Sequence, residues 1–143
     1  MTSPPLETVA RAAGWLLAVL AAAAGCVRAL PEQDRRIYGE ALAAKLSTDV
    51  LWQDYTTDAD AADRQYWGKA IEVSGNVTAV TPAPPHVVLT FGQDDQPGVQ
   101  ATLLDDEAEA IASTVKVGDR ITLRCYCEGL AGFVRLKSCI ARP

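Results

Sequence analysis

The feature that most constrains this chain is a change of hydrophobic period at Gly68. Before Gly68, the residues Ala59, Ala62 and Tyr66 recur at the spacing of one helix face. After it, apolar and outward residues alternate, as they do in a strand with one buried face. The alternating apolar residues are Ile71, Val73, Val77 and Ala79. The sequence therefore predicts a helix that turns directly into a long strand over residues 69–80.

Turn signals divide the remainder of the chain into short strands and one helix. Residues 82–85 are rich in proline, which supplies no amide donor to a sheet, and residues 92–98 form a second polar turn. We predict strands over 86–91 and 99–103, then a helix over 107–115 and two final strands. The inward residues of the final strands are Ile121, Leu123, Cys125, Cys127, Val134, Leu136 and Ile140. This order of elements is that of a five-stranded OB-fold barrel.

An N-terminal helical layer is expected before the barrel. The segment 31–46 begins with Pro31, which suits a first helical position, and its apolar residues recur at helical spacing. A second helix carries Leu51, Trp52 and Tyr55 on one face. Its candidate capping residues are Ser47, Thr48 and Asp49. The protein is thus predicted to be mostly β, with helices that pack against the barrel.

The N-terminus reads as a targeting segment. An uncharged run over residues 12–27 is short for a membrane span but suits the core of a signal peptide. The run ends in Ala23-Ala24-Gly25-Cys26, which resembles a bacterial lipobox, with Ala23 where leucine is favoured. We therefore expect lipidation of Cys26. The alternatives are ordinary cleavage after Ala24 or Ala29, and an uncleaved membrane anchor.

All three readings place the rest of the chain outside the cytoplasm, in the periplasm or envelope of a bacterium. A chain of 143 residues, 49% of them hydrophobic, has room for one domain with a sizeable core. We divide it into a signal or anchor segment, 1–26, a helical linker, 27–48, and an OB-fold domain with its leading helices, 49–143.

The charge pattern disfavours nucleic acid as a partner. The net charge is −5, and no Lys or Arg occurs between Lys69 and Lys116. OB-folds that bind single strands need cations and stacking aromatics, usually on their second and third strands. On the last two strands, alternation places three cations and one aromatic residue outward, and they form an alternative surface for nucleic acid. These residues are Arg124, Tyr126, Arg135 and Lys137.

No residue pattern indicates an enzyme, a cofactor or a metal. The acids of the leading helices are expected to be caps and a solvated face: Asp49, Asp54, Asp58, Asp60 and Asp63. Tyr66 and Trp67 either line a ligand groove or seal the helix onto the barrel. We predict a binding module for an envelope protein, a peptide or a glycan, with no prediction of its oligomeric state.

Several short motifs resemble one known family. The helix end reads Ala62-Asp63-x-x-Tyr66-x-Gly68-Lys69, and the next strand reads Val73-x-Gly75-x-Val77. Later matching residues are Gly118, Asp119, Cys127, Gly129, Val134, Leu136 and Cys139. These motifs are similar to those of the extracytoplasmic OB-fold family named for its likeness to tRNA-anticodon-binding domains. The resemblance spans 51–140 and implies the fold, but no assigned chemistry.

The sequence departs from this family in two places: Thr57 or Asp58 replaces a frequent asparagine, and Cys125 is additional. The resemblance and the adjacency of the last two strands favour a disulfide between Cys127 and Cys139. Strict alternation would put Cys139 outward, so this pairing needs a bulge near Ser138. Cys125 is then expected to be a buried, unpaired residue.

Overall fold

The computed structural model describes residues 33–93 and 96–142. They belong to one compact unit, Gln33–Pro143, to which the following description is confined. The predicted signal segment, Cys26 included, lies outside the described residues, as does the start of the linker. Within the described ranges, no helix is long and apolar enough to cross a membrane.

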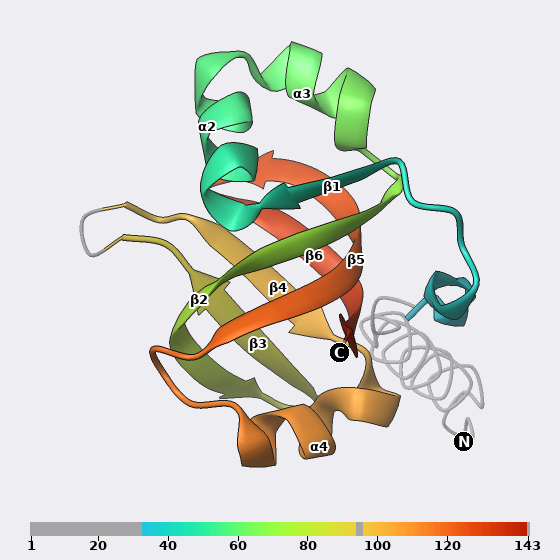
Figure 1. Cartoon of the computed structure of the whole chain (residues 1–143), viewed down its shortest axis with the longest axis vertical. Coiled ribbons are helices and arrows are strands. Elements are labelled where there is room, and N and C mark those ends of the chain that lie inside the picture. Colours follow the sequence, from blue (N-terminus) through green and yellow to red (C-terminus); the bar gives the residue numbers. More distant parts are fainter. Residues whose placement is uncertain (1–32, 94–95, 143) are drawn as a thin grey trace, which may run out of the picture. The chain divides into compact units, whose positions relative to one another are not determined.

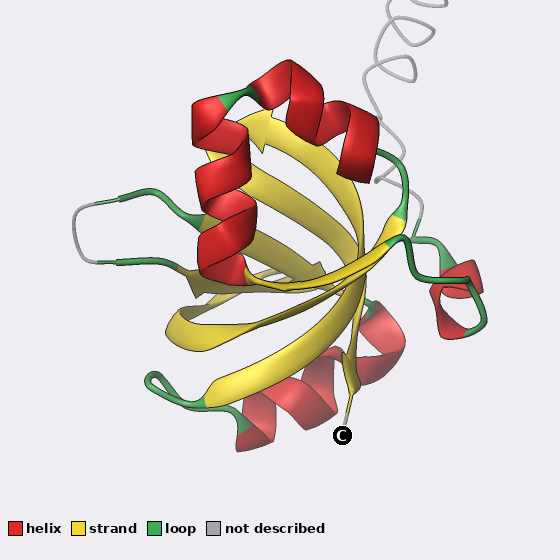
Figure 2. Ribbon diagram, turned by 45° about the horizontal axis from the view of Figure 1, so that its top comes forward, coloured by secondary structure: helices red, strands yellow, loops and turns green. Residues whose placement is uncertain are grey.

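The unit is an OB-fold barrel with one additional strand (Figure 1). Its elements are the 3-10 helix η1 (Arg35–Tyr38), β1 (Ala44–Ser47), α2 (Thr48–Thr57), α3 (Ala59–Tyr66), β2 (Ala70–Ala83), β3 (His86–Phe91), β4 (Val99–Leu103), α4 (Asp105–Thr114), β5 (Arg120–Ala131) and β6 (Phe133–Arg142). The barrel strands follow the order β2-β3-β4-β6-β5, and β2 closes the barrel by pairing with β5. The predicted fold class is therefore confirmed. Figure 2 shows α2 and α3 over one end of the barrel and α4 across the other.

The helix predicted over 31–46 is wrong for the part that the structure describes. That part contains only η1 and then β1, which pairs in parallel with β2 from Ala44 opposite Ile71 to Ser47 opposite Ser74. The reason lies in β2, because β3 pairs only with its residues from Val77 onward. The first half of β2 would otherwise leave an open sheet edge, and pairing at this edge outweighs the weak helical pattern.

Residues 33–42 form a strap over the outside of β5 and β6. Ile37 is fully buried there against Tyr126 and Ile140. The backbone N–H of Asp34 donates to Ser138 Oγ at 2.9 Å, and Gln33 Oε1 accepts from the N–H of Asp105 at 2.7 Å. Gln33 thereby satisfies an amide at the start of α4, where the capping position has no side-chain hydrogen bond of its own. The strap fixes residue 33 beside α4.

The predicted disulfide pairing is also wrong: Cys125 is bonded to Cys139, with Cα atoms 4.3 Å apart, and Cys127 is a buried free thiol. The predicted bulge does occur, because Ser138 has a φ of 52° and the register of β6 shifts there. The additional residue turns Cys139 into the barrel opposite Cys125, whereas Cys127 faces Leu136. Alternation puts both Cys125 and Cys127 of β5 inward, so the position of the bulge in β6 decides which of them pairs with Cys139.

The first turn of α2 lies very close to β2 at Gly75. A Cβ atom at Gly75 would clash with Thr48 Oγ1, and would lie 2.9 Å from Thr48 Cγ2 and 3.1 Å from Phe91 Cδ1. Thr48 itself is only 4% exposed. The missing side chain at position 75 therefore allows α2 to lie directly on the barrel.

We predict that Gly75→Ala destabilises the protein by about 2 kcal/mol, the usual scale for overpacking a filled site. Because the clash involves Thr48 Oγ1 and Cγ2, the same change should cost clearly less in a Thr48→Ala background. Denaturant unfolding of the full chain measures both values. Gly39→Ala is the matched control, since a Cβ at Gly39 meets nothing within 4 Å. Equal costs for Gly75→Ala in the two backgrounds would contradict this packing.

The disulfide can be mapped without ambiguity, because Tyr126 offers a chymotryptic site between the two cysteines of β5. After non-reducing digestion with trypsin and chymotrypsin, the Cys125 peptide should remain joined to the peptide that begins at Ser138 and contains Cys139. Cys127 should react with maleimide only after unfolding, because it is 1% exposed. Cys139→Ala should lower stability by about 2–4 kcal/mol, and Cys127→Ala should keep the bridge. A peptide containing Cys127 joined to Cys139 would refute the assignment.

Candidate functional site

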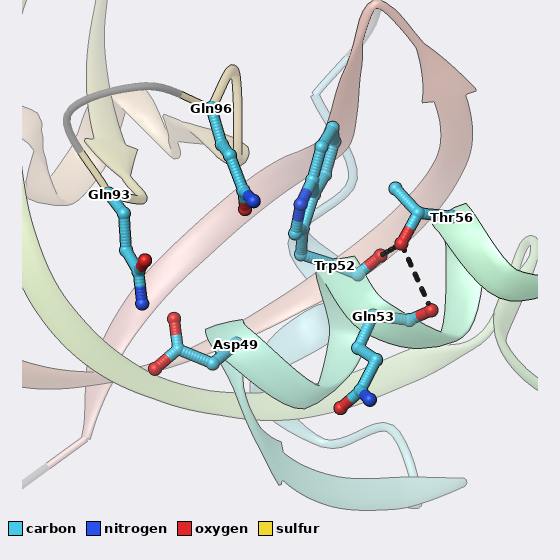
Figure 3. Close-up of a pocket in the computed structure, with 6 residues that line it drawn as sticks. All are labelled: Asp49, Trp52, Gln53, Thr56, Gln93 and Gln96. Carbon is cyan, nitrogen blue, oxygen red and sulfur yellow. Dashed lines mark hydrogen bonds between the residues drawn. The ribbon is translucent and has the colours of Figure 1, made fainter.

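A hollow of about 300 Å³ lies between α2 and the loop that joins β3 to β4. Its lining residues are Asp49, Trp52, Gln53, Thr56, Gln93 and Gln96. Figure 3 shows the indole of Trp52 facing Gln96, with Asp49 below Gln93. We call this hollow the α2 groove. It combines one large aromatic surface with several amide and carboxylate groups.

Helical spacing brings the α2 side of the groove together. Ser47 caps α2 by accepting from the N–H of Val50 at 3.2 Å, and Leu51 and Tyr55 turn one face into the core. The helix face next to this buried face carries the lining residues of α2, because they are spaced three or four residues apart. They are Asp49, Trp52, Gln53 and Thr56. The groove is therefore built on a helix that is held by its buried face.

The other wall comes from a loop that is narrow at its base. A Cβ at Gly98 would lie 2.9 Å from Gly92 Cα, and Gly98 has a φ of 73°, which favours glycine. The N–H of Gln96 donates to the carbonyl of Gln93 at 3.0 Å across the loop. This close approach keeps Gln93 and Gln96 on the same side as α2.

Most polar groups of the groove have no partner within the described part of the chain. Over residues 33–93 and 96–142, no hydrogen bond involves the side chains of Asp49, Gln53, Gln93 or Gln96, or the indole N–H of Trp52. Thr56 Oγ1 is the exception, because it donates to the carbonyls of Trp52 and Gln53 at 3.0 and 3.2 Å. The other side chains are thus available to a ligand.

A second hollow of about 440 Å³ lies between α2 and α3 and shares Gln53 with the groove. Its other lining residues are Asp54, Thr57, Asp58, Ala61, Ala62 and Gln65. Among the described residues, neither hollow is lined by a Lys or Arg. In the described ranges, no three His, Cys, Asp or Glu residues are placed to hold a metal ion. This end of the barrel is acidic and carries carboxylates without a metal cluster.

Beneath these hollows, two tyrosines tie the helices to the barrel. Tyr55 OH donates to Asp63 Oδ1 at 2.9 Å and lies 3.4 Å from Cys127 Sγ, and Tyr66 OH donates to Asp54 Oδ2 at 2.7 Å. Burial raises the pKa of Tyr55, raises that of Tyr66 to about 12, and raises that of the Cys127 thiol. These groups stay protonated at neutral pH, and a buried thiol of raised pKa is a poor nucleophile. The network is structural.

The structure separates the predicted pair Tyr66 and Trp67. Tyr66 is buried and belongs to the tyrosine network, so it seals α3 onto the barrel. Trp67 is 61% exposed, and its Cδ1 would lie 3.3 Å from a Cβ at Gly129. Neither residue lines the α2 groove.

The four residues predicted to face outward on β5 and β6 do not form an open surface together. Arg124 is 4.0 Å from Glu72 and its side chain is only 13% exposed. Tyr126 is buried under the strap, donates to Glu40 at 3.0 Å, and has its pKa raised to about 12, chiefly by burial. The remaining two are accessible: Lys137, which lies 3.5 Å from Glu128, and Arg135.

Sequence reasoning missed the α2 groove. The sequence pattern puts Trp52 on the same helix face as Leu51 and Tyr55. In the structure, Trp52 lies at the border of that face and lines the groove. The available signal was the series Asp49, Gln53 and Thr56, which marks a second, polar face next to Trp52. Nothing in the sequence could show that the turn holding Gln93 and Gln96 folds toward that face, because this depends on barrel closure.

The chain aligns with several solved structures, and one of the following alignments has a TM-score above 0.5. A protein from Klebsiella pneumoniae, described as a candidate nucleic acid-binding lipoprotein, aligns at a TM-score of 0.57 and 13% identity, over 79% of this chain and 100% of that chain. An aspartyl-tRNA synthetase candidate from Leishmania major aligns at 0.47 and 8%, over 79% and 22% of the chains. An OBody bound to hen egg-white lysozyme aligns at 0.44 and 10%, over 80% and 98%.

No protein of curated function matches the chain. A family model does match it, over residues 5–140, which is nearly its whole length. The model is that of the family that the helix-end and strand motifs resemble, and the closed barrel has the fold that this resemblance implies. The chain therefore belongs to the tRNA_anti-like family.

Proposed function

We propose that this protein is a non-enzymatic binding module of the bacterial envelope, anchored to the membrane by its N-terminus. Its partner is an envelope protein, a peptide or a glycan, which it contacts through the α2 groove. The family and the fold support the coarser part of this statement, an OB-fold binding module. The finer parts depend on the chemistry of the barrel surface and of the N-terminal sequence.

The observation that carries the proposal is the lack of cations where OB-folds usually bind their ligands. The outward residues of β2, β3 and β4 include Asn76, Thr78, Ala79, Thr81, Val88, Thr90, Gln100 and Thr102, and none of these strands contains a Lys or Arg. Within the described ranges, two accessible cations without an ion pair border this face: Arg135 beside Gln100, and Arg120 opposite Asn76. Phosphate backbones are bound by several Lys and Arg residues acting together.

The charge near the groove opposes nucleic acid further. Asp49 is part of its lining, and Asp54 and Asp58 line the neighbouring hollow. Carboxylates that line or adjoin a groove repel a phosphate group there, and they do not hinder an uncharged or cationic ligand. The name of the Klebsiella protein points to the alternative, a nucleic-acid module that uses Arg135 and Lys137. Of the four residues predicted for that surface, Arg124 is paired with Glu72 and Tyr126 is buried, so Arg135 and Lys137 are the accessible ones.

The envelope location rests on the N-terminal sequence, which lies outside the described residues. The lipobox-like residues 23–26 end an apolar run of signal-peptide length. The strap adds a structural consequence, because it fixes residue 33 to the barrel. Seven residue steps separate positions 26 and 33, which is about 25 Å when fully extended. An anchor at Cys26 would therefore hold the barrel close to the membrane surface.

We predict that the full chain binds no single-stranded oligonucleotide in a saturable manner, even at low salt. Fluorescence anisotropy with labelled oligothymidylate, at low and at raised salt, measures this directly. The matched variant is Arg135→Ala/Lys137→Ala, which removes the two accessible cations of the surface predicted on β5 and β6. Tight binding that weakens with salt and is lost in this variant would refute the proposal and establish the alternative.

The second prediction concerns the anchor. Intact-mass measurement of the protein in the membrane fraction should show a chain that begins at Cys26 and carries a diacylglyceryl and an acyl group. Cys26→Ser should remove the lipid and release the protein from that fraction. A full-length mass would show a helical anchor instead, and an unlipidated chain beginning after Ala24 or Ala29 would contradict membrane anchoring.

A further inference from the structure

We infer that the α2 groove binds a neutral sugar unit of a glycan, with Trp52 as the surface on which the sugar ring lies. This inference rests on the proposed function and narrows its ligand class from protein, peptide or glycan to glycan. It follows from three properties of the groove: a fixed aromatic surface, unpaired amide and carboxylate groups, and the absence of cations among its lining residues.

The indole of Trp52 is a supported surface. Trp52 is half-buried and packs against the cluster of buried residues that forms the main core. One part of the ring is therefore fixed by packing, while another part lines the groove (Figure 3). A sugar ring has a flat face of C–H groups that matches an aromatic ring, and little conformational entropy is lost when the aromatic ring is already held.

The polar groups around Trp52 suit hydroxyl and acetamido groups. Gln53, Gln93 and Gln96 each offer an amide donor and a carbonyl acceptor, and Asp49 offers acceptors only. A hydroxyl group donates and accepts at once, so it can bond to neighbouring amide and carboxylate groups together. Because these side chains have no other partners within the described ranges, binding would break no internal hydrogen bond.

The same groove is poorly suited to a nucleotide and to a peptide. A nucleotide would bring a phosphate toward Asp49 without a Lys or Arg in the lining to receive it. A peptide anchors through buried apolar or aromatic side chains, and Trp52 is the only large apolar residue that the described part of the chain contributes to the lining. A volume of about 300 Å³ is at the lower end for small-molecule sites, which fits single sugar units.

The test uses the whole protein labelled with 5-fluorotryptophan, which gives one fluorine NMR signal for each tryptophan that it retains. These are Trp52 and Trp67 in the form that begins at Cys26, and Trp15 as well in an uncleaved chain. Trp→Phe variants at positions 15, 52 and 67 assign the signals. The detergent must lack a sugar head group, which would occupy the groove. The probe is chitotetraose, and tetra-alanine and oligothymidylate serve as comparison ligands. We expect chitotetraose to shift the Trp52 signal and to leave the Trp67 signal unchanged.

Variants then locate the contact. Trp52→Ala should weaken chitotetraose binding about tenfold or more, because stacking and apolar contact are lost together. Gln93→Ala and Gln96→Ala should each weaken it several-fold. Trp67→Ala is the matched control, since Trp67 is an exposed tryptophan outside the groove. Unfolding curves identify any variant that fails to fold, and Trp52→Phe, which keeps an aromatic ring, should retain part of the affinity.

Each outcome decides a different point. A Trp52 shift with chitotetraose alone supports the inference. A shift with tetra-alanine and none with chitotetraose overturns the glycan and leaves the proposed envelope function intact. A shift with oligothymidylate alone overturns both. If no ligand shifts the Trp52 signal, the groove is not the sugar site and the inference fails, while the anchor and nucleic-acid tests of the proposed function stand separately.

Discussion

The contact between Thr48 and Gly75 is the constraint on which the ligand end of this barrel depends. β1 pairs with β2 up to Ser47 opposite Ser74, so α2 begins directly beside Gly75. Because Gly75 has no side chain, Thr48 can lie directly on β2, at a point that Phe91 also borders. Phe91 ends β3, next to the loop that carries Gln93. The close contact therefore fixes the α2 wall of the groove, next to the strand end from which the other wall starts.

A second constraint lies on the opposite side of the barrel. The bulge at Ser138 turns Cys139 toward Cys125, and Ser138 Oγ holds the N–H of Asp34. The same irregularity thus supports both the disulfide and the strap. The strap covers Tyr126 and reduces the exposed part of β5 and β6. Tyr126, which would otherwise offer an aromatic ring to nucleic acid, is used instead for internal packing.

The sequence predicts the barrel well because its strands follow strict alternation and its turns contain proline and glycine. The features that the sequence does not predict are those that depend on pairing between residues distant in the chain. Ala44 to Ser47 form a strand only because half of β2 lacks a partner, and Cys139 finds Cys125 only because of the exact place of one bulge residue. The groove depends on two segments that are distant in the chain, so Trp52 could be identified as a packing residue but not as a ligand surface.

The end of the barrel that carries the α2 groove is acidic and polar, and no cation of the described ranges lines its hollows. The most direct test is a crystal structure of the protein with a neutral oligosaccharide bound. We predict density for a sugar ring against Trp52, with hydroxyl groups near Gln93, Gln96 and Asp49. A sugar bound on the face of β3 and β4, or against Trp67, with an empty α2 groove, would contradict the account.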